Sequence, residues 1–156
     1  MVVLAFDQST NFSGFSVYNN GKLIDYGLID KHKIKNSYNR LVQMGLAISH
    51  KITEVKPDAV VVEDVFDHKN RITLVVLARL QGMIMYACTM DNIPLHIFSP
   101  SSWRKLLGFK QGGNVKRADL KQQAIDYVQH HFGLELSEDV AEAVCIGKAA
   151  SSAIDF

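Results

Sequence analysis

Two carboxylates, Asp7 and Glu63, each stand at the end of a short apolar run rich in β-branched residues. Such runs, VVLAF before Asp7 and AVVV before Glu63, are typical of strands that are buried on both faces. An ionised carboxylate at the end of a buried strand is costly unless a cation or hydrogen bonds compensate its charge. Because ligands of α/β sheets gather beyond strand ends, we interpret both acids as candidate site residues.

A second pair of acids, Asp139 and Glu142, lies three residues apart in an apolar helical stretch, so both project from the same helix face. Four oxygen ligands without a His or Cys cluster suit a hard cation such as Mg²⁺ or Mn²⁺. Two ions about 3.5–4 Å apart could activate water and stabilise the leaving oxygen of a phosphodiester. Without metal, converging carboxylates would raise one another's pKa values. The four acids together predict metal-dependent phosphodiester hydrolysis.

Each acid also has a purely structural interpretation. Asp7 could accept hydrogen bonds from the backbone of Ser9 or Thr10 in the turn after its strand. Asp139 and Glu142 lie near a helix start, where the helix dipole favours acids. Other catalytic patterns, G-x-x-x-x-G-K-[ST], G-x-S-x-G and H-E-x-x-H, are absent from the sequence. Only the combination of four acids favours chemistry over structure.

The elements that would carry these acids follow from hydrophobic periodicity and turn signals. We expect strands at residues 2–6, 12–18, 23–29, 59–63 and 95–98, with an Asn-Gly hairpin signal between the second and third. We expect helices at residues 37–55, 71–90, 100–107 and 115–131, and a last one that Ser137 caps and that ends near Ser151.

Three hairpin-linked strands followed by strands reached through helices predict a single α/β domain over residues 1–156. Its sheet would be mixed and five-stranded, with three antiparallel strands plus two parallel ones, flanked by helices on both faces. The helix at 71–90 is apolar almost all round, which predicts burial on two sides. One side would meet the sheet, and the other would meet another helix or another subunit.

The charges are segregated along the chain, although the net charge is only +1. Basic residues concentrate at 31–53 and 103–121, and acids dominate from residue 135 onward. This distribution suits a protein that holds a polyanion by its backbone and places carboxylates at one point of it. The alternative, for any single lysine, is that it simply keeps a helix surface hydrated.

The same sequence predicts a cytoplasmic protein without a membrane partner or a small-molecule cofactor. No uninterrupted apolar run reaches the ~18 residues of a membrane span, and the amino terminus lacks the pattern of a signal peptide. Cys88 and Cys145 lie in apolar helical contexts, so we expect buried free thiols rather than a disulfide.

Three ordered blocks of the chain resemble the RuvC group of Holliday junction resolvases, within the RNase H-like superfamily. The blocks are FDQSTNFSGFSV, then VVEDVFDHKN followed by LARLQG, and finally EDVAEAVCIG. They match the family's first strand with its catalytic Asp, its strand-end Glu with the following helix, and its terminal helix with two acids. The resemblance runs from Val2 to about Ala150 and implies an RNase H-like fold and paired cutting of four-way or other branched DNA. A compact chain of this kind is compatible with a bacterial or a phage source.

The resemblance implies roles for individual residues. The catalytic, metal-binding set would be Asp7, Glu63, Asp139 and Glu142. This set would hold magnesium, as two ions for which Mn²⁺ could substitute. Phe66 would work against bases at the junction centre, with core packing as its alternative, and the helix at 71–90 would form a homodimer interface. Further DNA contacts are expected from seven basic residues: Lys69, Arg71, Arg104, Lys105, Lys110, Lys116 and Arg117.

Two positions depart from the family pattern. The family usually has Asp where this chain has Glu142, and its Asp-Pro-Gly turn is here Asp7-Gln8-Ser9. Asp64 follows Glu63 directly, and adjacent strand residues face opposite ways, so only one of the two should reach the metals. The alignment favours Glu63.

Three other functions are weighed against junction resolution. An actin-like ATPase also begins with a strand, an Asp and a polar turn, but it needs two duplicated domains, for which 156 residues are too few. A protein that binds branched DNA without cutting it would not need four acids. Another RNase H-like nuclease, acting on RNA–DNA hybrids, is the nearest alternative.

Overall fold

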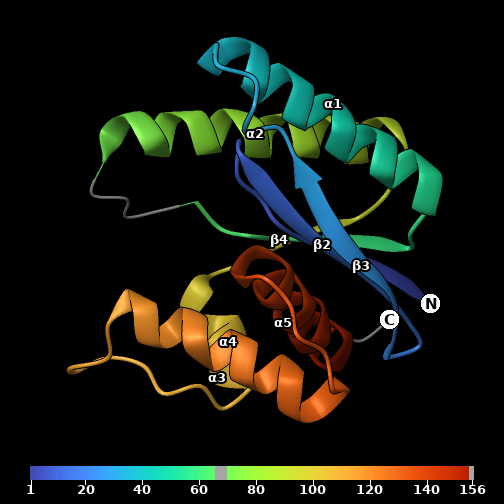
Figure 1. Ribbon diagram of the computed structural model, residues 1–156. Helices are drawn as coiled ribbons and strands as arrows, with labels where there is room; N and C mark the ends of the chain where they lie inside the picture. Colours follow the sequence, from blue (N-terminus) through green and yellow to red (C-terminus); the bar gives the residue numbers. More distant parts are fainter. Residues whose placement is uncertain (66–69, 155–156) are drawn as a thin grey trace.

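The computed structural model describes residues 1–65 and 70–154, and a five-stranded sheet forms its centre (Figure 1). The strands are β1 (Val2–Asp7), β2 (Phe12–Asn19), β3 (Lys22–Asp30), β4 (Ala59–Glu63) and β5 (Leu95–Phe98). They lie in the order β3-β2-β1-β4-β5. The pairs β1–β2 and β2–β3 are antiparallel, whereas β1–β4 and β4–β5 are parallel. The predicted mixed sheet is confirmed.

Helices cover both faces of the sheet, as predicted. They are α1 (Ser37–Val55), α2 (Arg71–Met90), α3 (Pro100–Leu106), α4 (Arg117–Phe132) and α5 (Glu138–Ala153). Figure 1 shows α1 and α2 on one side of the sheet, and α5 with α3 and α4 on the other. The arrangement has three layers, with the sheet in the middle.

The central strand β1 is buried on both faces because its side chains alternate between two cores. Leu4 and Phe6 pack in the cluster that contains buried residues of α1 and α2. Val3 and Ala5 pack in the cluster formed with α3, α4 and α5. This double burial explains why the sequence of β1 is an uninterrupted apolar run that ends at Asp7.

Helix α4 begins at Arg117, two residues later than the sequence predicts. The Val115 amide donates to the Gly112 carbonyl in a turn before the helix. At Lys116 the backbone is extended, and its amide donates to the Asp119 carboxylate at 2.8 Å. This local hydrogen bond sets the helix start, which apolar spacing alone does not reveal.

Helix α5 also differs slightly from its prediction. Ser137 occupies the capping position, but its side chain makes no capping hydrogen bond, so this part of the prediction is wrong. Its backbone carbonyl accepts from the Ala141 amide, the usual first bond of a helix. The helix continues to Ala153 rather than ending near Ser151. Helix α3 ends at Leu106, one residue earlier than expected.

Helix α2 is buried on one side within this chain, not on two. Its buried residues are Leu80, Ile84, Ala87 and Cys88. Its opposite side leaves several large apolar side chains exposed, among them Ile72 at 77%, Tyr86 at 67% and Met90 at 62% relative exposure. Besides the sheet, α2 meets another helix, as foreseen: it packs beside α1, where a Cβ atom on Gly45 would stand 2.2 Å from the methyl carbon of Met83. The exposed apolar side chains lie outside this contact.

Helix α2 is also long and apolar enough to cross a membrane, by length and composition only. Its most apolar 18-residue window has a mean hydropathy of 1.5, and 22% of that window is buried. This does not contradict the expectation of no uninterrupted apolar run of that length, because Arg79 and Gln81 interrupt the apolar run of this helix. One such helix is weak support for a membrane span, because core helices of soluble proteins meet the same limits.

Candidate active site

Two of the four acids meet at one edge of the sheet because their strands are parallel neighbours. Asp7 is the last residue of β1 and Glu63 is the last residue of β4. Phe6 pairs with Val62 in the ladder between these strands, so the two acids follow side by side. The carboxyl ends of parallel strands are the usual position of a site in an α/β sheet.

Helix α5 brings the other two acids to the same place. Its first turns carry Asp139 and Glu142, and both acids interact electrostatically with Asp7. The helix lies very close to β2: a Cβ atom on Gly14 would stand 2.0 Å from the Asp139 carbonyl oxygen. The Ser16 hydroxyl also donates to the Ala143 carbonyl at 2.7 Å. The close contact with β2 thus positions the acids of α5 beside those of the sheet.

The Asp7 carboxyl has the most perturbed environment of the four acids. Burial is the main cause that raises its pKa well above the usual range, and the charges of Glu142, Glu63 and Asp139 add to this effect. A side-chain hydrogen bond joins Asp7 to Glu142. The bond adds to the rise in the pKa of Asp7 and opposes the rise in the pKa of Glu142.

Basic residues partly offset the repulsion at the other acids. Burial raises the pKa of Glu142, against the effect of Arg104, the bond from Asp7 and the charge of Lys121. Burial also raises the pKa of Asp139, and Lys121 opposes this shift. Clusters of acids with raised pKa values are typical of functional sites, because folding stability alone gives no reason to assemble them.

The Glu63 side chain is held by two neighbours on α3. Trp103, which is fully buried, donates its indole N–H to Glu63 Oε2 at 2.6 Å. Arg104 places its guanidinium 4.0 Å from the same oxygen and 3.6 Å from Glu142 Oε1. Burial raises the pKa of Glu63, while the Trp103 bond and the Arg104 charge oppose the shift.

Two glutamine amides hold the backbone of Glu63. Gln8 Nε2 donates to the Glu63 carbonyl at 2.6 Å, and Gln81 Nε2 donates to it at 3.2 Å. Sequence reasoning missed both of these contacts, and also the contact of Trp103. Gln8 adjoins Asp7 and Gln81 lies in the LARLQG block, but only the packing of α2 against β4 shows that their amides meet at Glu63.

Local hydrogen bonds bear on two alternatives left open by the sequence. Asp64 Oδ1 accepts from the Val65 amide at 2.8 Å, so this carboxylate serves the turn after β4. The Ser9 amide donates to the Ser13 hydroxyl at 3.0 Å rather than to Asp7. Glu63 and Asp7 interact electrostatically with each other and with Glu142 on α5.

The four carboxylates fit a hard cation by their chemistry, although some of their oxygens contact Arg104 or one another in this conformation. Among residues 1–65 and 70–154, no three His, Cys, Asp or Glu side chains converge as ligands of one ion. Arg104 lies beside oxygens of Glu63 and Glu142 that a cation would use, and a side-chain hydrogen bond joins Asp7 to Glu142. Carboxylate oxygens without thiolate or imidazole are the ligands that Mg²⁺ and Mn²⁺ prefer.

A comparison of the sequence with models of known protein families gives a match. The family model described as "Crossover junction endodeoxyribonuclease RuvC" matches residues 3–150. The chain belongs to the RuvC family. The family predicted from the three sequence blocks is thereby confirmed, and all four acids lie within the matched residues.

Individual relatives and solved structures agree with the family assignment. The RuvC protein of Alkaliphilus metalliredigens is 24% identical to the chain, and the match covers 94% of this chain and 90% of the relative. The RuvC protein of Caldicellulosiruptor saccharolyticus is 27% identical, and the match covers 94% of this chain and 89% of the relative. The structure of Thermus thermophilus RuvC in complex with a Holliday junction substrate superimposes with a TM-score of 0.76 at 16% identity, covering 97% of this chain and 93% of that one. The yeast mitochondrial Holliday junction resolvase Ydc2 gives 0.60 at 12% identity, covering 96% and 77%. The predicted RNase H-like fold is thus confirmed.

The basic residues predicted to bind DNA in this RuvC family member lie in different settings. Lys105, Lys110, Lys116 and Arg117 are exposed on α3, on the loop after it and at the start of α4. Arg71 is exposed at the start of α2. Arg104, in contrast, is only 15% exposed and faces the acids, which differs from a simple surface contact. Phe66 and Lys69 lie outside the described residues, so their predicted roles stay predictions.

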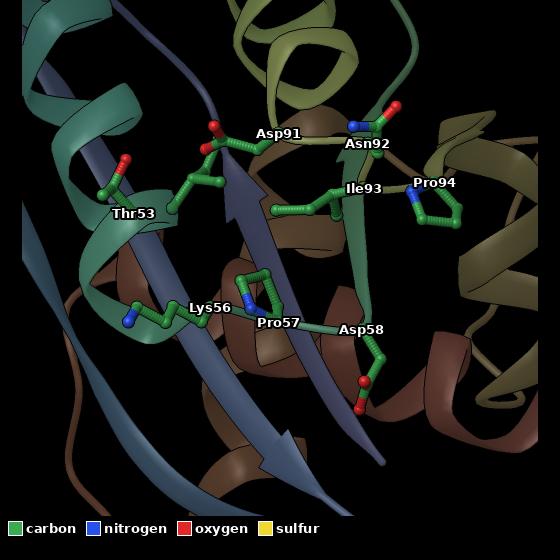
Figure 2. A pocket seen from close by; sticks show the side chains of 9 residues that line it. Thr53, Lys56, Pro57, Asp58, Asp91, Asn92, Ile93 and Pro94 are labelled. Atoms are coloured by element: carbon green, nitrogen blue, oxygen red, sulfur yellow. The ribbon is translucent and has the colours of Figure 1, made fainter.

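A pocket of about 520 Å³ lies away from the acids (Figure 2). Figure 2 shows its lining residues where α1 and α2 end and where β4 and β5 begin, including Lys56, Asp58, Asp91 and Pro94. Because Asp7 and Glu63 stand at the opposite ends of their strands, this pocket is separate from the candidate active site. None of the four acids lines it.

Proposed function

We propose that this RuvC family member resolves four-way DNA junctions, and other branched DNA, by paired metal-dependent cleavage of phosphodiester bonds. The observation that carries the proposal is the meeting of Asp7, Glu63, Asp139 and Glu142 at one sheet edge in a chain that belongs to this family. Branched DNA would be its substrate, as a Holliday junction is in the complex of Thermus thermophilus RuvC.

The four acids would hold two Mg²⁺ ions, with Mn²⁺ as a substitute. When bound, the ions would supply an activated water and stabilise the leaving oxygen of the phosphodiester. The chain's own contribution is to orient the ligands: Trp103 fixes one oxygen of Glu63, and the amides of Gln8 and Gln81 fix its backbone. The hydrogen bond between Asp7 and Glu142 would have to open before both acids could act as ligands.

The substrate choice is tested by a panel of DNA structures. Purified protein with Mg²⁺ is offered four-way, three-way, flap and linear DNA, together with an RNA–DNA hybrid, and the cuts are mapped. We expect symmetrically paired cuts in the four-way junction and little cutting of linear DNA. Preferred cleavage of the hybrid would instead assign the protein to another class of RNase H-like nuclease. Binding of junctions without any cut would indicate a protein that binds branched DNA but does not cleave it.

Exposed basic residues around α3 and α4 would bind the DNA backbone. Removing charge from Lys110, Lys116 and Arg117 together should weaken junction binding and flatten its salt dependence, because each lost phosphate contact lowers the slope of log K against log salt by about 0.9. Binding is measured by fluorescence anisotropy at several salt concentrations. Lys56→Gln, at the opposite sheet edge, is the matched control and should keep the slope of the unmodified protein. An unchanged slope in the triple variant would show that these residues lie off the DNA path.

The exposed side of α2 would form a homodimer interface. Ile72, Val75, Tyr86 and Met90 recur at helical spacing along this side, and an exposed apolar stripe of this kind marks an interaction surface. A two-fold dimer would present two active sites to the two strands that a junction requires to be cut.

Dimerisation is tested with Ile72→Glu and Tyr86→Glu combined. Charges on both partners of a symmetric interface should convert the dimer to a monomer and abolish paired cutting, while the circular dichroism spectrum stays the same. Light scattering after gel filtration gives the molecular mass. Ile24→Glu, at an equally apolar exposed position on β3, should leave the mass unchanged. A monomeric unmodified protein at micromolar concentration would contradict the proposed interface.

The compartment proposed for this activity is the cytoplasm. Cys88 and Cys145 are both buried free thiols, as the sequence predicts, and free cysteines are usual in a reducing compartment. The DNA substrate of a recombination nuclease is found there in a bacterial cell.

A further inference from the structure

Arg104 lies beside two of the acids and is mostly buried. Its Nη2 atom stands 3.6 Å from Glu142 Oε1 and 4.0 Å from Glu63 Oε2, and only 15% of its side chain is exposed. A guanidinium is always charged, so this side chain places a permanent positive charge between two acids that come from β4 and α5. No other ion pair of the described residues joins these two acids.

The guanidinium is positioned but not fully satisfied. Its central carbon lies 4.9 Å from the centre of the Trp103 ring, and Trp103 is itself anchored by its bond to Glu63 Oε2. Yet the Nε–H of Arg104 is buried and donates to no atom of the described residues. The ion-pair distances are also longer than those of a bidentate arginine–carboxylate pair. The contact therefore differs from a fully bonded arginine–carboxylate pair.

The oxygens beside Arg104 are those that the proposed cations require. Glu63 and Glu142 each turn an oxygen toward the guanidinium. A divalent cation bound to these oxygens would stand close to the arginine charge, and like charges at this distance repel strongly in a partly buried site. Arg104 and the cation therefore compete for the same two acids unless the guanidinium moves.

We propose that Arg104 is an internal counter-ion of the metal-free site, which must release Glu63 and Glu142 before cations bind and which then contacts a backbone phosphate of the DNA. The inference rests on the proposed function, because it assumes that the four acids bind divalent cations. Arg104 lies in the last turn of the short helix α3, next to the exposed Lys105. Arg104 is thus a positioning residue that links metal binding to DNA binding.

The competition is measured with Mn²⁺ alone, in the absence of DNA, by titration calorimetry. Arg104→Gln should bind Mn²⁺ at least about tenfold more tightly than the unmodified protein, because a full charge near the acids is removed. Its metal-free melting temperature should fall, since Glu63 and Glu142 lose their counter-ion. Arg104→Lys should restore Mn²⁺ affinity toward the original value, and Lys105→Gln, an exposed charge on the same helix, should change it little. Unchanged or weaker Mn²⁺ binding by a folded Arg104→Gln variant would overturn the proposal.

A second measurement uses the unmodified protein and does not depend on the folding of a variant. The Nε–H resonance of Arg104 in a ¹⁵N-arginine spectrum should shift and exchange faster with solvent when Mg²⁺ is added. A resonance that stays the same at saturating Mg²⁺ would also overturn the proposal. The Asp7→Asn variant separates this failure from a failure of the proposed function. If the unmodified protein binds no Mn²⁺, or if Asp7→Asn binds Mn²⁺ as tightly as the unmodified protein, the acids are not the metal site. Both proposals then fail.

Discussion

Replacing Asp7 by Asn should abolish DNA cleavage, with a loss of at least about 10²–10³-fold, the range for removing one electrostatic stabiliser of a transition state. Asp7 lies at the centre of the cluster and interacts with all three other acids, so no neighbour can replace it as a ligand. Junction binding should remain nearly intact, because phosphate contacts supply most of the affinity. Cleavage is measured on a four-way junction, and binding is measured on the same DNA with Ca²⁺.

The matched control is Asp25→Asn, which removes an exposed carboxylate from β3 and should cut at the original rate. Glu63→Gln and the equivalent changes at Asp139 and Glu142 should behave like Asp7→Asn. Glu142→Asp should be tolerated, since it restores the residue that the family usually has. Near-original cleavage by Asp7→Asn or Glu63→Gln would remove that residue from the proposed metal site.

Asp7→Asn should also raise the melting temperature of the metal-free protein at neutral pH. Burial and the neighbouring acids raise the pKa of Asp7 in the folded state, so the folded protein binds this proton more tightly than the unfolded chain. The stability that the proton contributes is complete at acid pH and is lost as the pH rises through the folded-state pKa. Asn keeps the neutral form at every pH, so the advantage of the variant should grow from acid to neutral pH. Differential scanning fluorimetry with a chelator measures it, and Mg²⁺ should reduce the difference by stabilising the original protein.

Replacing Gly14 by Ala should impair cleavage severely although Gly14 has no chemical group of its own. The added Cβ would lie 2.0 Å from the Asp139 carbonyl oxygen and 2.9 Å from the Val140 amide nitrogen. These are backbone atoms in the first turn of α5 and cannot rotate away, so the helix must move outward with Asp139 and Glu142. Overpacking of this kind typically costs about 1–3 kcal/mol of folding stability, and misplacing reacting groups by about 1 Å can cost roughly a hundredfold in rate.

Gly27→Ala separates the loss of stability from the loss of geometry. Its added Cβ would lie 2.8 Å from the ring of Phe15, a side chain in the core cluster on the other face of the sheet from α5. This variant should lose some stability but keep its cleavage rate well below its melting temperature. Equal cleavage rates for Gly14→Ala and Gly27→Ala under those conditions would contradict the role given to the contact between β2 and α5.

The local sequence determined the strand ends and the helix faces that carry the acids. The apolar runs before Asp7 and Glu63 predict two buried strands that stop at a carboxylate, and the structure has β1 and β4 ending at these residues. The three-residue spacing of Asp139 and Glu142 likewise predicts that they share a helix face. These features could be predicted because side chains alternate between faces along a strand and share a face every three to four residues along a helix, so a few neighbouring residues reveal them. Together with the three ordered blocks, they were sufficient to predict the mixed sheet and the family.

Tertiary packing alone decided how these pieces meet. The Ser16–Ala143 hydrogen bond joins residues 127 positions apart, and no local pattern indicates that α5 would approach β2 at Gly14. Packing also turned Arg104 inward to the acids, although its basic surroundings in the sequence predict a surface contact with DNA. It left one side of α2 exposed, because a continuous apolar helix has the same sequence pattern whether its second side meets the same chain or another one. The chemistry of each acid was thus encoded locally, whereas its neighbours, and through them its pKa and its counter-ion, depended on contacts between distant elements.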